Sequence, residues 1–258
     1  MDLHLTGRTA LVTGGARGIG LGVAKLLAAE GCHLHLASRN AANLDAAQRD
    51  IVAAYGVKVA THTLDLSLTG NVLKLARLVG NVDILVNNAG AIPHGPITGL
   101  GDSEWRDGWE LKVFGYIALT REIYREMCAM QRGVIINVVG TAGERPSAGY
   151  IAGAMGNAAL MAMSRALGAE SIFHGVRVVA VNPGGIETER PVAQLKAQAA
   201  RKLGDEQRWR ELLADRPMKR MGSVDEVAAT IVFLCSDRCA YTSGTVVTVD
   251  AGASARKR

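Results

Sequence analysis

The sequence predicts a single α/β domain, a Rossmann-like, doubly wound parallel sheet of about seven strands with helices on both faces. Three observations support this prediction. Short β-branched runs alternate with longer helical patterns along the whole chain. Two strand segments, Ile84–Val86 and Val178–Val181, are continuously apolar, as strands buried on both faces must be. The first strand also runs into a glycine-rich turn that opens a helix, which is typical of doubly wound sheets.

The elements follow one another in a regular order. The first helix has its apolar residues, among them Ile19, Val23 and Leu27, on one face. A polar helical stretch, about 189–215, interrupts the alternation and is interpreted as a flap. We expect helices near 18–30, 41–55, 67–79, 102–131, 148–173 and 223–236, and strands at Arg8–Thr13, His33–Ala37, Lys58–Thr63, Val82–Asn87, Gly133–Val139, Val176–Asn182 and Thr245–Asp250.

Length and composition exclude several classes of protein. The 258 residues, 48% hydrophobic and 21% charged, suit one globular domain spanning 1–258 and exclude disorder and a disulfide scaffold. The four cysteines form no CxxC pair, no metal-ligand pattern occurs, and no segment is apolar enough to cross a bilayer. No signal peptide is visible, so we expect a cytoplasmic protein without a membrane partner.

The charge balance gives no reason to expect a nucleic-acid partner. The net charge is +5, but three of the positive charges belong to Arg256, Lys257 and Arg258 at the end of the chain. The body of the protein is therefore close to neutral, and no motif that reads nucleic acid is present. We expect residues 254–258 to form a flexible basic tail.

The turn after the first strand, Thr13-Gly14-Gly15-Ala16-Arg17-Gly18-Ile19-Gly20, is suited to a dinucleotide. Its glycines allow a sharp turn, a close approach to a pyrophosphate and tight packing of the next helix. The N-terminus of that helix then presents free N–H groups to the phosphates. In its strand–turn–helix context the motif predicts a cofactor site.

The second strand indicates which dinucleotide is bound. An acid at the position of Ser38 would bind a ribose 2′-hydroxyl and repel a 2′-phosphate, and no acid is present. Arg39 and Arg17 are instead able to pair with the phosphate, which favours NADP(H) over NAD(H). The alternative is that both arginines are solvated surface residues.

Several further motifs resemble those of the short-chain dehydrogenase/reductases, and the resemblance covers nearly the whole chain. They are Asp65-Leu66, Asn87-Asn88-Ala89-Gly90, Asn182-Pro183-Gly184-Gly185-Ile186-Glu187-Thr188, and the tail motifs Arg220-Met221-Gly222 and Val249-Asp250-Ala251-Gly252. The resemblance implies an oxidoreductase that interconverts a secondary alcohol and a ketone. It also implies a small-molecule substrate and a homotetramer or homodimer. The implied cofactor contacts are the glycine turn (Gly14, Arg17, Gly18, Ile19, Gly20), Ser38 and Arg39, Asp65 and Leu66 at the adenine, Asn87, Ala89 and Gly90, and Pro183, Gly184, Ile186 and Thr188 at the nicotinamide.

The catalytic positions depart from the pattern that the resemblance implies. That family uses an Asn, a Ser and a Tyr-x-x-x-Lys pair. At the positions that align with them this sequence has Lys112, Gly140, Gly153 and Asn157. The resemblance therefore implies a divergent member in which Lys and Asn have exchanged places.

Tyr150 offers a replacement for the missing tyrosine. It lies three residues before Gly153 and seven before Asn157, so helical geometry puts the three on one face. We hypothesise that Tyr150 is the acid/base, that Lys112 lowers its pKa, that Asn157 binds the ribose and that Thr141 supplies a hydroxyl, although strand alternation would point Thr141 the other way. The alternative is that Tyr150 and Lys112 are ordinary structural and solvated residues.

His94 and two residues of the flap are further candidate site residues. His94, in the loop after the fourth strand, is a second candidate proton donor or simply a surface histidine. The flap residues Pro191 and Trp209 are candidate substrate contacts. The alternative function is a dinucleotide-binding sensor or scaffold without dehydrogenase activity, because the glycine turn and Arg39 would serve it equally well.

Overall fold

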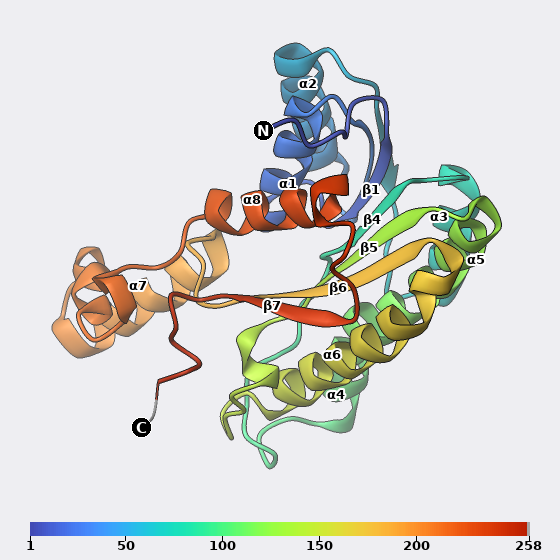
Figure 1. Ribbon diagram of the computed structural model, residues 1–258. Helices are drawn as coiled ribbons and strands as arrows, with labels where there is room; N and C mark the ends of the chain where they lie inside the picture. Colours follow the sequence, from blue (N-terminus) through green and yellow to red (C-terminus); the bar gives the residue numbers. More distant parts are fainter. Residues whose placement is uncertain (257–258) are drawn as a thin grey trace.

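The computed structural model describes residues 1–256, and these form one parallel sheet of seven strands in the order β3-β2-β1-β4-β5-β6-β7. The chain winds outward from β1 to one edge, crosses back to β4 and then winds to the other edge (Figure 1). The predicted fold class is confirmed. The strands are β1 (Thr9–Thr13), β2 (His33–Ser38), β3 (Val59–Thr63), β4 (Ile84–Asn87), β5 (Gly133–Val138), β6 (Val176–Pro183) and β7 (Thr245–Val249).

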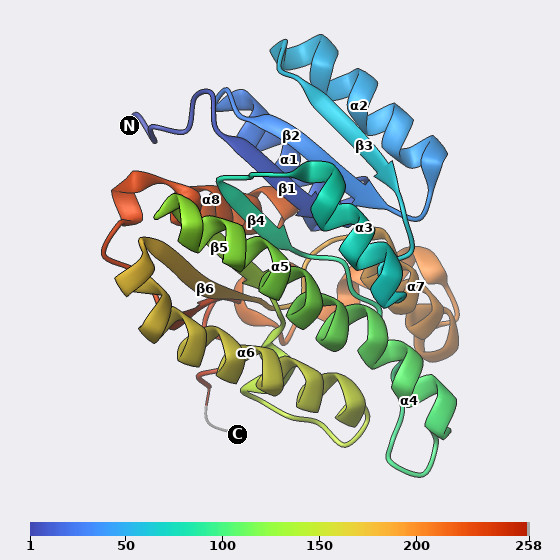
Figure 2. The same ribbon diagram turned by 90° about the vertical axis from the view of Figure 1, so that its right-hand side faces the viewer.

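Helices cover both faces of this sheet. Helices α1, α2 and α8 pack on one face and α3, α5 and α6 on the other (Figures 1 and 2). Every residue of β6 is buried, which explains the continuously apolar run Val178–Val181 within it. The helices are α1 (Gly18–Ala29), α2 (Ala41–Tyr55), α3 (Thr69–Val79), α4 (Asp102–Trp109), α5 (Gly115–Met130), α6 (Ile151–Ser171), α7 (Glu189–Leu203) and α8 (Val224–Cys235).

The long helix expected over 102–131 is interrupted by one wide turn. Residues Glu110–Phe114 form a π-helical turn between α4 and α5. Such turns are rare and frequently occur at functional sites. Lys112 lies in this turn, which places its side chain toward the carboxyl ends of β4 and β5.

The flap is a helical unit with a small core of its own. Helix α7 is followed by a 3₁₀ segment, Glu206–Leu213, and the two pack through Leu195, Trp209 and Leu213. Trp209 is therefore buried in the flap and is not available to a substrate, contrary to the sequence-based expectation. In Figure 1 this unit projects beyond the carboxyl ends of β6 and β7.

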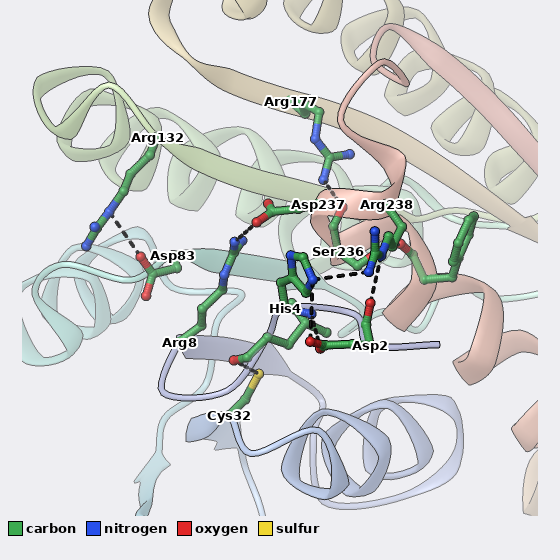
Figure 3. Close-up of polar contacts among 12 residues, drawn as sticks. Asp2, His4, Arg8, Cys32, Asp83, Arg132, Arg177, Ser236, Asp237 and Arg238 are labelled. Atoms are coloured by element: carbon green, nitrogen blue, oxygen red, sulfur yellow. Dashed lines mark hydrogen bonds and ion pairs between the residues drawn. The ribbon is translucent and has the colours of Figure 1, made fainter.

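Polar side chains close the opposite, amino-terminal end of the sheet (Figure 3). Arg8 forms an ion pair with Asp237, and the Arg238 Nε donates to the Asp2 carbonyl at 2.7 Å. The buried Arg177 guanidinium donates to the Ser236 carbonyl at 3.0 Å. These contacts attach the N-terminal segment and the segment after α8 to the sheet, at the end opposite the carboxyl ends of the strands.

The described part of the C-terminal tail packs against the end of the flap. Arg256 Nη1 donates to the Asp215 carbonyl at 3.4 Å, whereas the last two residues of the expected basic tail, Lys257 and Arg258, lie outside the described residues. In the stretch from Met1 to Arg256, no helix has the length and apolar character that crossing a membrane requires.

Candidate active site

A cleft of about 550 Å³ opens at the carboxyl ends of the strands, next to β1 and β4. After β1 the chain continues toward one edge of the sheet, and after β4 it continues toward the other. Open α/β sheets bind their ligands at this switch point. All four predicted catalytic residues line the cleft: Lys112, Thr141, Tyr150 and Asn157. Most of the predicted cofactor contacts line it as well: Gly14, Arg17, Gly18, Ile19, Ser38, Arg39, Leu66, Ala89, Gly90, Pro183, Gly184, Ile186 and Thr188.

Three positions of the glycine turn, Gly14, Gly18 and Gly20, require glycine. Gly14 and Gly18 have φ angles of +65° and +55°, in the left-handed region that favours glycine. A Cβ on Gly20 would lie 2.2 Å from the Gly14 carbonyl oxygen. The turn therefore brings bare backbone to the start of α1, where free N–H groups attract a pyrophosphate.

Three predicted cofactor residues lie behind this lining. Gly20 lies in the first turn of α1, against the Gly14 carbonyl oxygen. Asp65 accepts hydrogen bonds from the backbone and hydroxyl of Ser67. Asn87 is fully buried and its Nδ2 donates to Thr120 Oγ1 and Asn137 Oδ1, at 3.0 and 2.9 Å. Its observed contacts therefore join β4 to α5 and β5.

Exposed arginines surround one end of the cleft. Arg39 Nη1 lies 3.8 Å from Asp65 Oδ2, and Arg17 Nη1 lies 3.7 Å from Glu189 Oε2. These contacts are long and exposed, and ion pairs of this kind contribute little to stability. Both guanidinium groups are thus accessible to a phosphate.

Tyr150 lies directly against Gly153. A Cβ on Gly153 would be only 2.0 Å from Tyr150 Cζ, so the phenol ring occupies the space in which a side chain at Gly153 would begin. Tyr150 is the residue that precedes α6, and its backbone pairs with that of Gly95 in the loop after β4. The His94 ring stacks on the Tyr150 ring, with centroids 4.0 Å apart.

The electrostatic surroundings of Tyr150 differ from the sequence-based hypothesis. Burial raises the pKa of the Tyr150 phenol, and the charge that lowers it is that of Arg190 on α7. Burial and Arg190 together lower the pKa of His94, which favours a neutral imidazole at pH 7. Sequence reasoning missed Arg190, because an arginine in a polar helix is normally a solvated residue.

Lys112 is held by a backbone carbonyl. Its Nζ donates to the Val139 carbonyl oxygen at 2.8 Å, and its aliphatic chain lies over Gly90, where a Cβ would approach Lys112 Cδ to 2.7 Å. Burial lowers the pKa of the Lys112 amine to about 8. Within residues 1–256 no carboxylate forms an ion pair with this amine.

Asn157 lies against Gly140. A Cβ on Gly140 would lie 3.1 Å from Asn157 Nδ2, so the glycine allows the amide to approach. Asn157 Oδ1 is buried without a hydrogen-bond partner in the described chain. Strand β5 ends at Val138, and Thr141 begins a 3₁₀ turn beyond it. The alternation argument against Thr141 therefore does not apply, and its side chain joins the cleft.

These features fit a nicotinamide dinucleotide better than a metal ion. The bare glycine turn, the exposed arginines and the unpaired Asn157 oxygen supply donors and acceptors for phosphate and ribose groups. No cluster of three or more His, Cys, Asp or Glu side chains suited to a metal occurs in residues 1–256. The fold and the cleft define a Rossmann-type dinucleotide-binding protein.

Comparison with known proteins identifies the family. A family model described as enoyl-(acyl carrier protein) reductase matches residues 14–254. A solved structure described as a short chain dehydrogenase/reductase family protein is 32% identical, with a TM-score of 0.86, over 99% of this chain and 100% of the other. The chain belongs to the short-chain dehydrogenase/reductase family.

Individual relatives are reductases and dehydrogenases by name. The 3-oxoacyl-[acyl-carrier-protein] reductase FabG of Escherichia coli is 34% identical over 97% of this chain and 98% of its own length. Galactitol 2-dehydrogenase of Cereibacter sphaeroides is also 34% identical, over 96% of each chain. The L-sorbose reductase of Gluconobacter frateurii, solved with NADPH and L-sorbose, has a TM-score of 0.94 at 32% identity and complete coverage of both chains.

Proposed function

We propose that this protein is an NADP(H)-dependent oxidoreductase that reduces a ketone to a secondary alcohol through a rearranged active site. The observation that carries the proposal is the position of Tyr150. Its ring fills the space above Gly153 in the same cleft as Lys112, Asn157 and the glycine turn. A phenol at this place is a proton donor within the cofactor cleft.

Tyr150 is proposed as the acid/base. Because burial raises the pKa of its phenol, Tyr150 stays protonated at neutral pH and is ready to donate to a carbonyl oxygen. The reverse reaction needs a phenolate, which this environment disfavours. The proposal therefore includes a preference for ketone reduction near pH 7.

The other three residues are assigned supporting roles. Lys112 supplies a positive charge near the end of β5, where it favours negative charge developing on the substrate oxygen. Asn157, with its unpaired Oδ1, is proposed to bind a ribose hydroxyl. Thr141 offers a hydroxyl to orient the carbonyl. These roles keep the exchange of Lys and Asn predicted from the sequence, and Arg190 joins them as the cation whose charge acts on Tyr150.

The cofactor assignment is supported by residues of this chain and by its relatives. A nicotinamide dinucleotide bound here would supply the hydride. Arg39 and Arg17 are proposed to hold its 2′-phosphate, with Ser38 offering no repelling charge. The L-sorbose reductase named above was solved with NADPH, which agrees with this assignment. The sensor or scaffold alternative gains no support from relatives named as reductases and dehydrogenases.

A direct test compares wild type with Tyr150→Phe. We expect wild type to oxidise NADPH, followed at 340 nm, in the presence of at least one member of a ketone panel. Tyr150→Phe should lower kcat by about 10²- to 10⁴-fold, because the phenol proton is lost. The affinity for NADPH, measured by fluorescence titration, should be unchanged, since the ring and its stacking on His94 remain.

The control is Tyr55→Phe, which alters a half-exposed tyrosine at the end of α2, outside the cleft. Its turnover should equal that of wild type. Full activity of Tyr150→Phe would refute the acid/base assignment. Tight NADPH binding without turnover across the panel would favour the sensor or scaffold alternative.

A further inference from the structure

We propose that the site selects ketones that carry a carboxylate, that is, oxo acids, and that Arg190 binds this carboxylate. The inference rests on the proposed reductase function and adds a substrate class to it. Arg190 is the second residue of α7 and lines the cleft together with Tyr150 and Lys112. Arg190 is therefore available on the same cleft as the proposed proton donor.

The exposed Arg190 side chain reaches from α7 to the loop after β4. Its Nη2 donates to the Ile92 carbonyl oxygen at 3.4 Å, in the loop after β4 that also carries His94. The guanidinium is close enough for its charge to act on both His94 and Tyr150. Arg190 thus links the flap to the loop beside the proton donor.

No carboxylate within residues 1–256 forms an ion pair with Arg190. Its single hydrogen bond, to a neutral carbonyl, is long. A guanidinium has five N–H donors in a planar fork that matches a carboxylate. Most of its hydrogen-bonding capacity therefore remains for a ligand.

The charge distribution along the cleft supports an anionic substrate. The only carboxylate among the described lining residues is Glu189, which pairs with Arg17 at the glycine turn. Apart from Arg17, Arg39 and Glu189, the charged residues among the described lining are Lys112 and Arg190, both positive. A neutral ketone would leave this positive charge uncompensated, whereas an oxo acid would balance it.

Other nearby charged side chains are already engaged. Arg145 Nη1 donates to the Ala253 carbonyl at 2.6 Å, and Glu144 Oε2 accepts from the Thr248 hydroxyl at 3.3 Å. Neither residue lines the cleft. Arg190 is consequently the side chain that we assign to the substrate carboxylate.

The test compares oxo acids with their uncharged esters. Pyruvate, acetoacetate and levulinate are each assayed beside the methyl ester, with the NADPH-loaded full-length protein. We expect at least one acid to exceed its ester by about tenfold to hundredfold in kcat/KM, the range for a charge-assisted hydrogen bond. In Arg190→Gln this ratio should fall to about one, mainly through a higher KM for the acid, and Arg190→Lys should keep part of it.

A matched control is Arg201→Gln, which removes an exposed arginine elsewhere on α7 and should leave the ratio unchanged. Equal use of acid and ester by wild type would overturn the inference while leaving the reductase proposal intact. A loss of NADPH affinity in Arg190→Gln, measured by fluorescence, would show that Arg190 binds the cofactor phosphates instead, and would also overturn it.

The affinity for acids and esters, measured without turnover, distinguishes this inference from the reductase proposal. Calorimetric titration of the NADP⁺-loaded protein with each acid and ester measures affinity without turnover. If wild type reduces nothing but binds an acid, and Arg190→Gln abolishes that binding, the carboxylate site stands and the reductase proposal fails. If neither acids nor esters bind or react while another ketone of the panel is reduced, the carboxylate inference fails and the reductase proposal stands.

Discussion

The phenol ring of Tyr150 lies in the space where a side chain on Gly153 would begin, with a Cβ at that glycine only 2.0 Å from Tyr150 Cζ. The two residues are three apart in sequence, and Tyr150 immediately precedes the helix that Gly153 belongs to. A tyrosine at the start of α6 thus reaches into the cleft because position 153 has no side chain. The position of the Tyr150 ring therefore depends on the glycine at 153.

Gly153→Ala is expected to lower activity because the new methyl group displaces the Tyr150 ring. Overpacking of this kind typically costs about 1–3 kcal/mol, and the flexible ring is the part that moves. We expect kcat to fall by at least about tenfold, since a shift of about 1 Å at a reacting group is enough for a large loss. The measurement is NADPH oxidation with the best ketone.

Gly70→Ala is the control for this substitution. A Cβ at Gly70, in the first turn of α3, meets no atom within 4 Å. Its activity should equal that of wild type. Unchanged kcat in Gly153→Ala would show that the position of the Tyr150 ring does not matter for turnover.

The pH dependence of ketone reduction should report on Lys112. Burial lowers the pKa of its amine to about 8, so the positive charge is present below that pH and is lost as the pH rises through it. If this charge stabilises the developing oxyanion, kcat/KM should decline above about pH 8. In Lys112→Arg the guanidinium stays charged, and the decline near pH 8 should disappear.

Lys74→Arg serves as the matched control, because Lys74 is exposed on α3 and does not line the cleft. Its pH profile should match that of wild type. A decline that persists unchanged in Lys112→Arg would assign the titration to a different group.

The alternation of apolar strands and amphipathic helices was enough to predict the order and approximate bounds of the elements. Burial on both faces explains the apolar run Val178–Val181 in β6, and that signal is local in the sequence. The observed bounds of the strands differ from the predicted bounds by a few residues at most. The π-helical turn at Glu110–Phe114 was not predicted, because its periodicity is nearly that of the helix around it.

Contacts between distant segments were harder to predict. Arg190 meets the loop after β4 only in the folded chain, so its sequence context shows just a polar flap. Trp209 looked like a substrate contact but packs in the flap's own core. For Thr141, the alternation rule was applied three residues past the end of β5, where it no longer holds.

Cofactor preference should depend on Arg39. Arg39→Asp replaces a cation at the end of β2 with an anion, which would repel a 2′-phosphate and accept a bond from a ribose 2′-hydroxyl. We expect the Kd for NADPH to rise by about 10- to 100-fold, given the usual strength of a charge-assisted bond, with little change for NADH. Fluorescence titration with both nucleotides measures this.

Arg49→Asp, on the exposed face of α2, makes the same change of charge away from the cleft. It should affect both affinities equally and weakly. An equal loss of NADPH affinity in Arg49→Asp would mean that overall charge, rather than the Arg39 contact, determines the preference.

Gly168 should be a sensitive position for the stability of the sheet. It lies in α6 where the helix crosses the start of β7, and a Cβ there would be 2.3 Å from the Gly244 nitrogen and 2.6 Å from the Val178 carbonyl oxygen. These two atoms already form a hydrogen bond of 2.9 Å that joins β6 to the segment before β7. Both partners are backbone, so neither can move aside as a flexible side chain would.

Gly168→Ala is therefore expected to lower the free energy of unfolding by at least about 1–3 kcal/mol, measured by urea denaturation. Ala169→Ser, one position further on the exposed face, should stay within about 0.5 kcal/mol of wild type. Since Gly168 lies outside the cleft, the residual folded fraction of Gly168→Ala should retain its NADPH affinity. Wild-type stability in this variant would mean that α6 can move away from the sheet without cost, and that the close approach of helix and strand does not restrict this position.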